Sequence, residues 1–475
     1  MIAASLQPAS VKAACESRRR WAFGLTPRTI GLLIAGFLWL IPGFWDSELS
    51  YAMLAWDALI LLAAFLDGLR LPRATDLTAS RSWTNAPALD SETEIELTLE
   101  NRSRTIIVCR LEDDLPPALV SQPSTQQLTV FPRVPATVRF RIEPQERGDC
   151  EAHSLYVLYR SPLGLAERWA KARLDQKVRV YPALRTGEEQ KLFLARSRQI
   201  DLQLRQARQR GLGRDFESLR EYREGDDLRD ICWTATARRG TPITRQYQTE
   251  RSQPVWIVLD CGRLMRSRVA AIAKGKAALP VAEPGARVHS KLDFACTTAV
   301  SLAQLALYSG DRVGLLAYGQ GTQQRLLPGR GAAHLRQIIE SLAQVRAESS
   351  EADHLRATAT LNRLQPRRSL ILWITDLAES AMRPEVIDGA VQLLRRHVLL
   401  FVAMAQPEVD MIARARPKNV EQMFRAAAAQ EMAGRRELLL ARLHEQGALT
   451  LDLNPEALTS SILNQYLNVK ERAMV

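Results

Sequence analysis

Two long apolar segments lie close to the start of the chain. Residues 29–45 contain no charged side chain, and residues 49–66 contain one, Asp57. As α-helices with a rise of about 1.5 Å per residue they would be about 25 and 27 Å long, close to the ~30 Å hydrocarbon core of a bilayer. Only residues 46–48 join them. The pattern therefore predicts an antiparallel transmembrane hairpin within residues 1–73.

Positive charges flank this hairpin, and its connecting loop has none. The flanking residues are Lys12, Arg18, Arg19, Arg20 and Arg28 before it and Arg70, Arg73 and Arg81 after it. The positive-inside rule then places both ends in the cytoplasm and the loop outside. The alternatives are a cleaved signal peptide and a hairpin buried in a soluble domain. However, no A-x-A-like cleavage site follows the first segment, and a second apolar segment does.

Asp57 lies near the middle of the second segment. A carboxylate that faces lipid there costs a few kcal/mol. Two interpretations stay open: a polar contact with another membrane protein or a second copy, or a side chain that is protonated or close to the interface.

Residues 74–184 change to short runs of alternating polar and apolar side chains. Examples are residues 93–99, 137–142 and 154–159, with turn residues between the runs. This period of two predicts antiparallel strands, and about seven short strands in this length predict an immunoglobulin-like β-sandwich.

From residue 254 to residue 475, continuous apolar runs alternate with helical patterns. The predicted strands are Val255–Leu259, Arg312–Tyr318, Ser369–Thr375, His397–Met404 and Leu449–Leu451, and the predicted helices are Leu292–Tyr308, His334–Val345, Glu385–Arg396 and Val420–His444. Buried strands that alternate with helices indicate a doubly wound, parallel α/β sheet. Residues 275–290, rich in Ala, Gly and Pro, are expected to form an inserted loop.

Residues 185–253 form a charged linker between the two folded regions, with a helix expected over 188–210. From Arg196 to Arg251 there are 13 positive and 9 negative residues, and they interleave. The whole chain of 475 residues has 64 basic and 52 acidic residues, a net charge of +12. That balance permits anionic lipid or nucleic acid as a partner, but the interleaved acids in the linker argue against a nucleic-acid surface.

Catalytic patterns are missing from the sequence. It has no H-E-x-x-H, no G-x-S-x-G and no G-x-x-x-x-G-K-[ST] segment, and its six cysteines include no C-x-x-C pair. One arrangement could bind a ligand: Asp260 and Asp376 each end a predicted strand of the same parallel sheet. Two carboxylates at the carboxyl ends of strands can hold a hard cation, although they can equally cap the helices that follow.

The segment from Gly211 to Arg251 resembles the sequence motif of the domain of unknown function 58 family, and this motif is called the signature below. The positions that carry it include Arg220, Tyr222, Gly225, Asp226, Arg229, Trp233, Arg238, Arg245, Tyr247 and Glu250. Upstream, residues 147–149 and 161–169 resemble the sandwich region of that family. The resemblance therefore covers nearly the whole chain.

The resemblance implies a C-terminal domain similar to a von Willebrand factor A domain. Such domains often hold a divalent cation through an Asp-x-Ser-x-Ser motif. Here Gly262 and Leu264 stand at the two serine positions after Asp260. Mg²⁺ is therefore doubtful, no cofactor is favoured, and Asp260 and Asp376 stay as weak metal candidates.

The resemblance also implies a function. Members of this family accompany MoxR-type AAA+ ATPases, so we expect a membrane-anchored, non-enzymatic interaction factor that works with such an ATPase on client proteins. Neither a nucleic acid nor a small-molecule substrate is expected. The alternatives are a metal-dependent enzyme or hydrolase with an unrecognised site, and a nucleic-acid-binding membrane protein.

Two roles are open for the signature. Its arginines, acids and aromatic residues could form a buried ion-pair hinge between domains, with Trp233 packed inside, or they could form a docking surface for a partner. Under the hinge hypothesis Arg196, in the helix before the signature, should be a solvated residue of little consequence.

Overall fold

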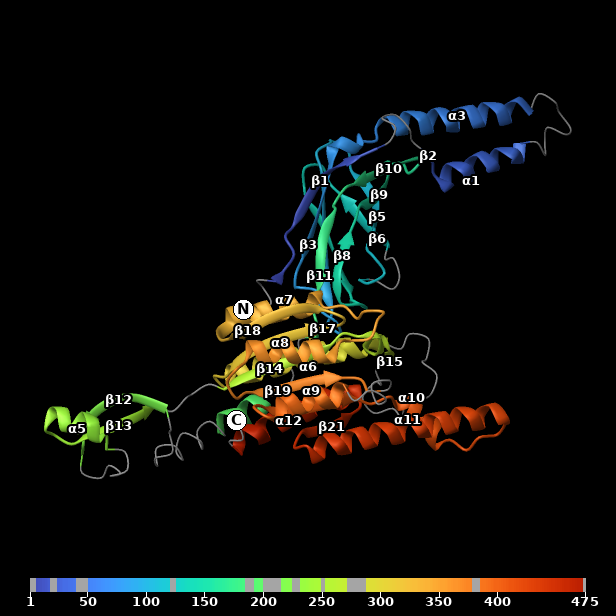
Figure 1. Ribbon diagram of the computed structural model, residues 1–475. Coiled ribbons are helices and arrows are strands. Elements are labelled where there is room, and N and C mark those ends of the chain that lie inside the picture. The colour runs from blue at the N-terminus through green and yellow to red at the C-terminus, as the bar shows by residue number, and fades with distance from the viewer. Residues whose placement is uncertain are drawn as a thin grey trace. The chain divides into compact units, whose positions relative to one another are not determined.

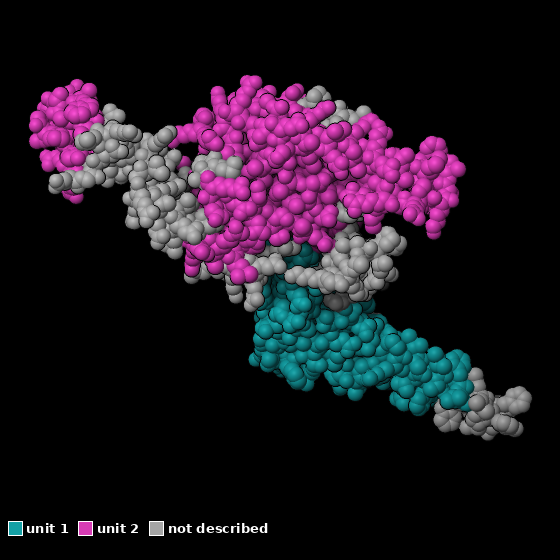
Figure 2. Space-filling model, turned by 90° about the horizontal axis from the view of Figure 1, so that it is seen from below, with its two compact units in different colours: residues 1–183 teal, residues 184–475 magenta. Residues whose placement is uncertain are grey.

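The computed structural model describes residues 6–17, 24–39, 50–119, 125–183, 192–199, 215–223, 231–248, 253–270, 288–377 and 385–472. The chain divides into two compact units, residues 1–183 and 184–475 (Figure 2). The architecture is mixed, with strands in both units and a helical hairpin in the first.

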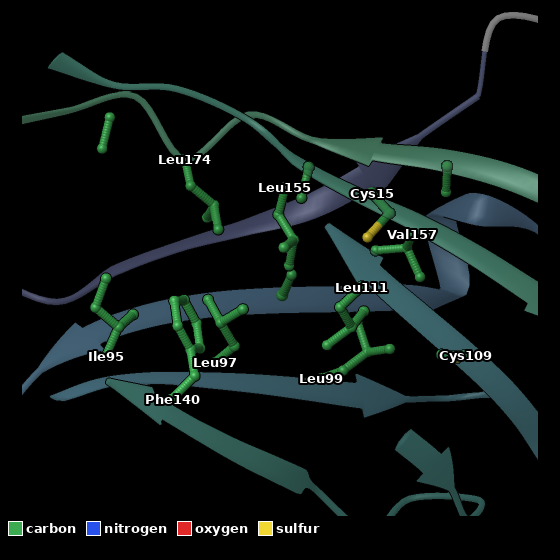
Figure 3. Packing of buried hydrophobic residues seen from close by; sticks show 14 of the residues in the cluster. Cys15, Ile95, Leu97, Leu99, Cys109, Leu111, Phe140, Leu155, Val157 and Leu174 are labelled. Carbon is green, nitrogen blue, oxygen red and sulfur yellow. The ribbon is translucent and has the colours of Figure 1, made fainter. Parts of the chain in front are cut away.

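The first unit is built on antiparallel strands, as the alternating pattern predicts. The strands of its main sheet are β1 (Val11–Glu16), β2 (Gly24–Leu25), β3 (Leu77–Trp83), β4 (Thr93–Asn101), β5 (Ile107–Asp113), β6 (Thr125–Val130), β7 (Ala136–Ile142), β9 (Leu155–Arg160) and β10 (Ala166–Ala172). They follow the order β6-β5-β9-β10-β1-β3-β4-β7, with β2 beside β10, while β8 (Gly148–Ala152) and β11 (Gln176–Val180) form a separate pair. Side chains from the two halves of the sheet face each other across one core (Figure 3).

Strand β1 joins the two halves of this sheet. It pairs antiparallel with β3, with Lys12 opposite Ser80 and Ala13 opposite Ala79, and it also pairs with β10 through Cys15. The sequence pattern places the start of the β domain at residue 74, but the structure includes residues 11–16 as well. Cys15 is fully buried in the core, so β1 is part of the domain although the hairpin separates it from β3 in sequence.

Two helices form the hairpin between these strands. They are α1 (Pro27–Gly36), continued by the 3₁₀ turn η2 (Phe37–Trp39), and α3 (Ser50–Leu69). Of the helices in the described ranges, only the one over Tyr51–Leu69 is long and apolar enough to cross a membrane. The structure therefore supports one of the two predicted spans, because α1 has ten residues and residues 40–49 lie outside the described part.

The two helices lie side by side (Figure 1). Trp56 Nε1 of α3 donates a 2.9 Å hydrogen bond to the carbonyl oxygen of Leu32 in α1. A Cβ atom on Gly36 would lie 2.5 Å from Asp57 Oδ1, so glycine is what allows this close approach. Asp57 thus faces α1, and its Oδ1 has no hydrogen-bond partner among the described residues.

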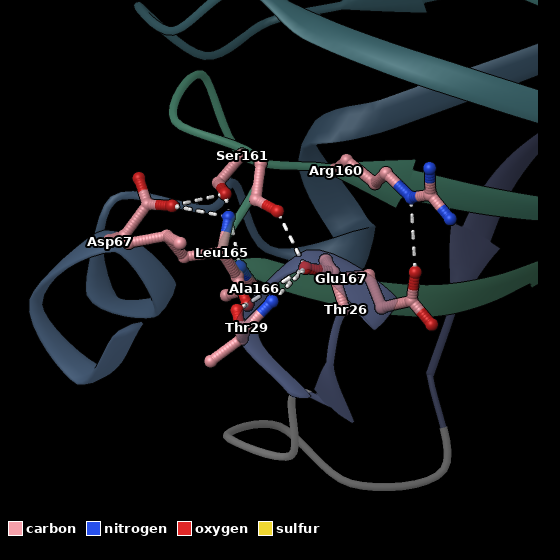
Figure 4. A network of polar contacts seen from close by, with 9 residues as sticks. Thr26, Thr29, Asp67, Arg160, Ser161, Leu165, Ala166 and Glu167 are labelled. Carbon is pink, nitrogen blue, oxygen red and sulfur yellow. Dashed lines mark hydrogen bonds and ion pairs between the residues drawn. The ribbon is translucent and has the colours of Figure 1, made fainter. Parts of the chain in front are cut away.

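A single turn of the β domain holds the base of both helices (Figure 4). Thr26 Oγ1, at the N-cap of α1, donates to the carbonyl oxygen of Gly164 at 2.6 Å, and Thr29 Oγ1, in the first turn of α1, donates to that of Leu165 at 2.6 Å. At the end of α3, Asp67 Oδ2 accepts hydrogen bonds from Ser161 Oγ and from the Leu165 N–H group. The turn lies within residues 161–169, the segment that resembles the family. This segment therefore holds the hairpin on the β strands.

The second unit contains the predicted parallel sheet. Its strands are β14 (Pro254–Asp260), β17 (Arg312–Tyr318), β18 (Thr322–Gly329), β19 (Leu370–Thr375), β20 (Val398–Met404) and β21 (Leu449–Leu453), in the order β18-β17-β14-β19-β20-β21. All pairs are parallel except β17–β18. The helices are α6 (Lys291–Tyr308), α7 (Gly331–Gln344), α8 (His354–Leu364), α9 (Glu385–Leu394), α10 (Pro407–Arg414), α11 (Val420–Glu445) and α12 (Leu458–Glu471).

The inserted loop predicted after the first strand is described only at its ends. Strands β15 (Arg268–Ala270) and β16 (Val288–Ser290) pair antiparallel, and residues 271–287 between them lie outside the described part. The 3₁₀ turn η6 (Arg263–Arg266) connects β14 to β15.

The charged linker is partly folded. Residues 192–199 are helical, and β12 (Asp215–Glu221), α5 (Trp233–Arg239) and β13 (Ile243–Gln248) form a small module. The Arg196 guanidinium nitrogens donate to Asn464 Oδ1 at 3.1 Å and to Asn468 Oδ1 at 3.0 Å, both in α12. Its side chain is 43% exposed, as expected for a solvated residue, and it also links the helix over 192–199 to α12. That Arg196 has little effect on stability stays a prediction.

Candidate functional site

Parallel neighbouring strands bring the two predicted acidic residues to one edge of the sheet. β14 ends at Asp260, and the adjacent β19 ends at Thr375, one residue before Asp376. Thr375 Oγ1 donates a 2.6 Å hydrogen bond to Asp260 Oδ2, and the Gly262 N–H group donates one of 2.7 Å to Asp260 Oδ1. Both carboxylates are buried. The strand ends therefore form an enclosed polar cluster.

A buried lysine neutralises the second carboxylate. Lys291, the first residue of α6, donates from Nζ to Asp376 Oδ2 at 2.5 Å, and only 1% of its side chain is exposed. Gln406 Nε2 donates to the same oxygen at 3.1 Å, and Arg436 approaches Asp376 Oδ1 to 3.8 Å. A positive charge at a helix N-terminus opposes the helix dipole, so the buried ammonium depends on the Asp376 carboxylate.

Burial shifts the titration of the groups around Asp260. It raises the pKa of the Asp260 carboxyl, because water no longer solvates the charged form, while the nearby His354 opposes that shift. Burial likewise lowers the pKa of His354, against the attraction of Asp260. Tyr318 Oη is 2.9 Å from His354 Nδ1 and accepts a 2.6 Å hydrogen bond from Trp373 Nε1. Tyr318 and Trp373 are part of the hydrophobic core.

The backbone near Ala352 packs closely against Gly262, the first of the two positions at which the Asp-x-Ser-x-Ser motif has a serine. A Cβ atom on Gly262 would lie 2.9 Å from Ala352 N and 3.1 Å from Asp260 Oδ1. The segment that carries Ala352 is held in place by a 2.9 Å hydrogen bond from the Arg263 N–H group to the Ser350 carbonyl oxygen. A serine at position 262 would therefore require the backbone around Ala352 to move.

The residues described here do not fit a divalent cation. Asp376 already pairs with the buried Lys291 ammonium, and a cation added beside that ammonium would be repelled in a site of low dielectric. Across the described ranges, no group of three or more His, Cys, Asp and Glu side chains could hold a metal ion. No metal chemistry is therefore assigned to Asp260 or Asp376.

The signature residues fall in and around the small module of β12, α5 and β13. Arg220 lies in β12 and Tyr222 directly after it, Trp233 and Arg238 lie in α5, and the backbones of Arg245 and Tyr247 lie in β13. Gly225, Asp226, Arg229 and Glu250 lie outside the described residues, as do the side chains of Arg245 and Tyr247. The predicted ion-pair network therefore lies mainly outside the part of the chain that the structure describes.

Trp233 differs from the expectation of a packed side chain. It is the first residue of α5, and 69% of it is exposed. None of the seven residues of α5 is buried. Among the side chains of this module that the structure describes, the buried ones are instead Ile231, Cys232, Ile243 and Thr244, which lie at the start of β13 and in the segment that bridges to it. A two-stranded ribbon with one short helix has too little interior to cover a tryptophan.

Comparison with known proteins supports the family resemblance over part of the chain. Residues 218–412 match the family described as "Protein of unknown function DUF58". The DUF58 match contains most of the signature and both strand-end carboxylates. Uncharacterized proteins of Mycobacterium tuberculosis and Mycobacterium bovis are 25% identical over 201 residues, which is 42% of this chain and 56% of theirs.

Two solved structures resemble the chain only weakly. The conserved hypothetical protein BatB from Bacteroides thetaiotaomicron has a TM-score of 0.28 and 12% identity, over 46% of this chain and 100% of BatB. Proximal thread matrix protein 1 from the mussel byssus has a TM-score of 0.29 and 11% identity, over 46% of this chain and 47% of its own. Scores this low carry no argument about fold or function.

We expect the strand-end ion pair to stabilise the second unit. Replacing Lys291→Met leaves the Asp376 carboxylate buried without its main partner, at a cost of about 3–5 kcal/mol in the free energy of unfolding. Urea denaturation of the purified protein measures this cost. Arg266→Ala, at an exposed position of η6, is the matched control and should change stability by no more than about 0.5 kcal/mol.

The double variant Lys291→Met with Asp376→Asn separates charge from packing. It removes both charges, so it should recover part of the stability lost in Lys291→Met. The account is contradicted if Lys291→Met is as stable as the parent protein.

Proposed function

We propose that this chain is a membrane-anchored, non-enzymatic interaction factor. The β domain of the first unit and the whole second unit lie on the cytoplasmic side of a bacterial inner membrane. The second unit is a von Willebrand factor A-like domain. The protein works with a MoxR-type AAA+ ATPase on client proteins. The observation that carries the membrane-anchored part of this proposal is the pairing of β1 with β3 across the apolar hairpin.

This pairing restricts how the chain can cross a membrane. β1 precedes the hairpin and β3 follows it, so hydrogen bonding between them requires both ends of the hairpin to lie on one side. The number of crossings between the two strands must then be even. If α3 provides one crossing, a second crossing must lie elsewhere between the two strands. Two spans satisfy this condition, and the charge pattern favours the same number.

The surface of the hairpin supports contact with lipid. The exposed large apolar residues of its two helices and the 3₁₀ turn are Ile30, Leu32, Ile34, Phe37, Leu38, Tyr51, Leu54, Leu59, Leu61, Leu62, Phe65, Leu66 and Leu69. A contiguous apolar surface of this kind is unfavourable in water and favourable in a bilayer.

The strand ends of the second unit are closed, which supports a role in binding a partner and not in catalysis. The Lys291–Asp376 pair is buried, and the backbone near Ala352 covers Gly262. The sequence also lacks a nucleotide-binding loop, so a partner ATPase would have to supply the energy for any work on a client. The exposed Trp233 favours the docking hypothesis for the signature, because exposed tryptophans are frequent anchors of protein interfaces.

The membrane topology can be tested with a membrane-impermeant thiol reagent applied to spheroplasts. Ser47→Cys, in the loop predicted outside, should be labelled in intact cells. Glu92→Cys, exposed at the start of β4, should be labelled only after permeabilisation. Cys109 is a poor reporter because it is buried. Efficient labelling of Glu92→Cys in intact spheroplasts would invert the topology and remove the cytoplasmic ATPase from the proposal.

The docking role of the signature predicts that stability and binding respond differently to one substitution. Trp233→Ala removes an exposed side chain, so unfolding should change by no more than about 0.5 kcal/mol while capture of a purified MoxR-type ATPase from the same organism is lost. Arg239→Ala, exposed on the same helix, is the control and should keep both. If Trp233→Ala unfolds at much lower urea concentration and still captures the ATPase, Trp233 is a structural residue and the docking hypothesis is wrong.

A further inference from the structure

Three loops of the first unit gather at the end of the β domain where the hairpin leaves it. They are residues 101–106, 131–135 and 161–165, together called the collar here. Asn101 forms an isolated bridge with Pro132, and the Arg133 N–H group donates 2.7 Å to the Asn101 carbonyl oxygen. The first two loops therefore touch each other.

Strand register places both of these loops beside the hairpin base. Asn101 at the end of β4 is opposite Leu77, the first residue of β3 after the hairpin, and the Arg102 N–H group donates 2.9 Å to the Asp76 carbonyl oxygen. Val108 near the start of β5 is opposite Arg160, the last residue before the Ser161–Leu165 turn. That turn binds the start of α1 and the end of α3, so the collar lies at the end of the domain where the hairpin is attached.

The collar exposes large apolar side chains that a β domain in water would bury. Ile106 is 45% exposed, Phe131 52%, Val134 54% and Leu163 60%. They come from three separate loops and lie at one end of the domain. The hairpin, which also exposes large apolar side chains, leaves the domain at this same end.

Positive charge accompanies these apolar residues. The exposed arginines of the collar and hairpin base are Arg28, Arg70, Arg102, Arg104 and Arg133, and the three collar loops contain no acidic residue. Arg133 adopts a left-handed conformation with a φ of 60°, which favours glycine or asparagine, so an arginine is present there at a conformational cost. Guanidinium groups bind phosphate oxygens in a bidentate manner and are attracted to an anionic leaflet.

We propose that the collar is a lipid-binding surface that seats the β domain in the anionic headgroup layer of the membrane. The apolar side chains enter the boundary between headgroups and acyl chains, and the arginines contact lipid phosphates. The inference rests on the proposed membrane anchoring and adds a second contact that holds the domain against the bilayer. The chemistry is that of an anionic phospholipid surface, since mixed apolar and basic side chains are typical of interfacial binding.

Site-directed spin labelling of the full chain tests this proposal. A nitroxide is placed at Val134→Cys, at Glu92→Cys on the opposite end of β4, and at Leu59→Cys in α3, in vesicles of phosphatidylcholine with phosphatidylglycerol. Collisions with oxygen, which is enriched in lipid, are compared with collisions with a water-soluble nickel complex. We expect the Val134 label to favour oxygen, the Leu59 label to favour it more strongly, and the Glu92 label to favour nickel. Arg104→Gln with Arg133→Gln should shift the Val134 label toward nickel several-fold.

The three positions separate failure of this inference from failure of the anchoring. A Leu59 label in lipid together with a Val134 label in water overturns the lipid-binding collar and leaves the anchoring intact. A Leu59 label in water overturns both. A Val134 label shielded from oxygen and nickel alike would show a protein contact at the collar and also overturn the lipid assignment.

Discussion

The pairing of β1 with β3 is the constraint on which the arrangement of the first unit depends. β1 is also the strand that links the two halves of the β sheet, so the domain cannot close without the residues that precede the hairpin. The hairpin is therefore an insertion into a folded domain and not a separate leader. The same domain then provides the Ser161–Leu165 turn that binds Thr26, Thr29 and Asp67, which connects both helices of the hairpin to the sheet.

In the second unit, the chain itself balances the charge at the strand ends. Its strand ends carry two carboxylates at the edge where α/β proteins commonly bind ligands, but a lysine of the chain itself pairs with one of them. Because the Lys291 ammonium belongs to the chain, it balances the charge of Asp376 without an ion from solution. The exposed features then lie elsewhere, at Trp233 in the small module and at the collar of the first unit. We propose both as binding surfaces.

The sequence predicts local elements well and long-range contacts poorly. Arg312–Tyr318 is identical in prediction and structure, because a buried parallel strand has a continuous apolar pattern. β1 was missed because Val11 to Glu16 contains small and charged residues, and its partner β3 lies beyond the hairpin. Lys291 was missed for a similar reason, since a lysine at a helix start looks exposed until Asp376, 85 residues away, is placed beside it. Trp233 was expected to pack in a hinge between domains because aromatic residues usually pack, but 69% of it is exposed.

Cross-linking β1 to β3 in the membrane tests the central claim most directly. Lys12→Cys with Ser80→Cys places two thiols at directly paired positions, where a disulfide is geometrically accessible, while Lys12→Cys with Ser82→Cys is two residues out of register. Mild oxidation of membrane vesicles that contain the full chain, followed by non-reducing electrophoresis, reports the bond. We expect efficient cross-linking of the first pair and little of the second, with the hairpin inserted. Failure of the Lys12–Ser80 pair to cross-link in membranes, although it does so in detergent, would contradict the account.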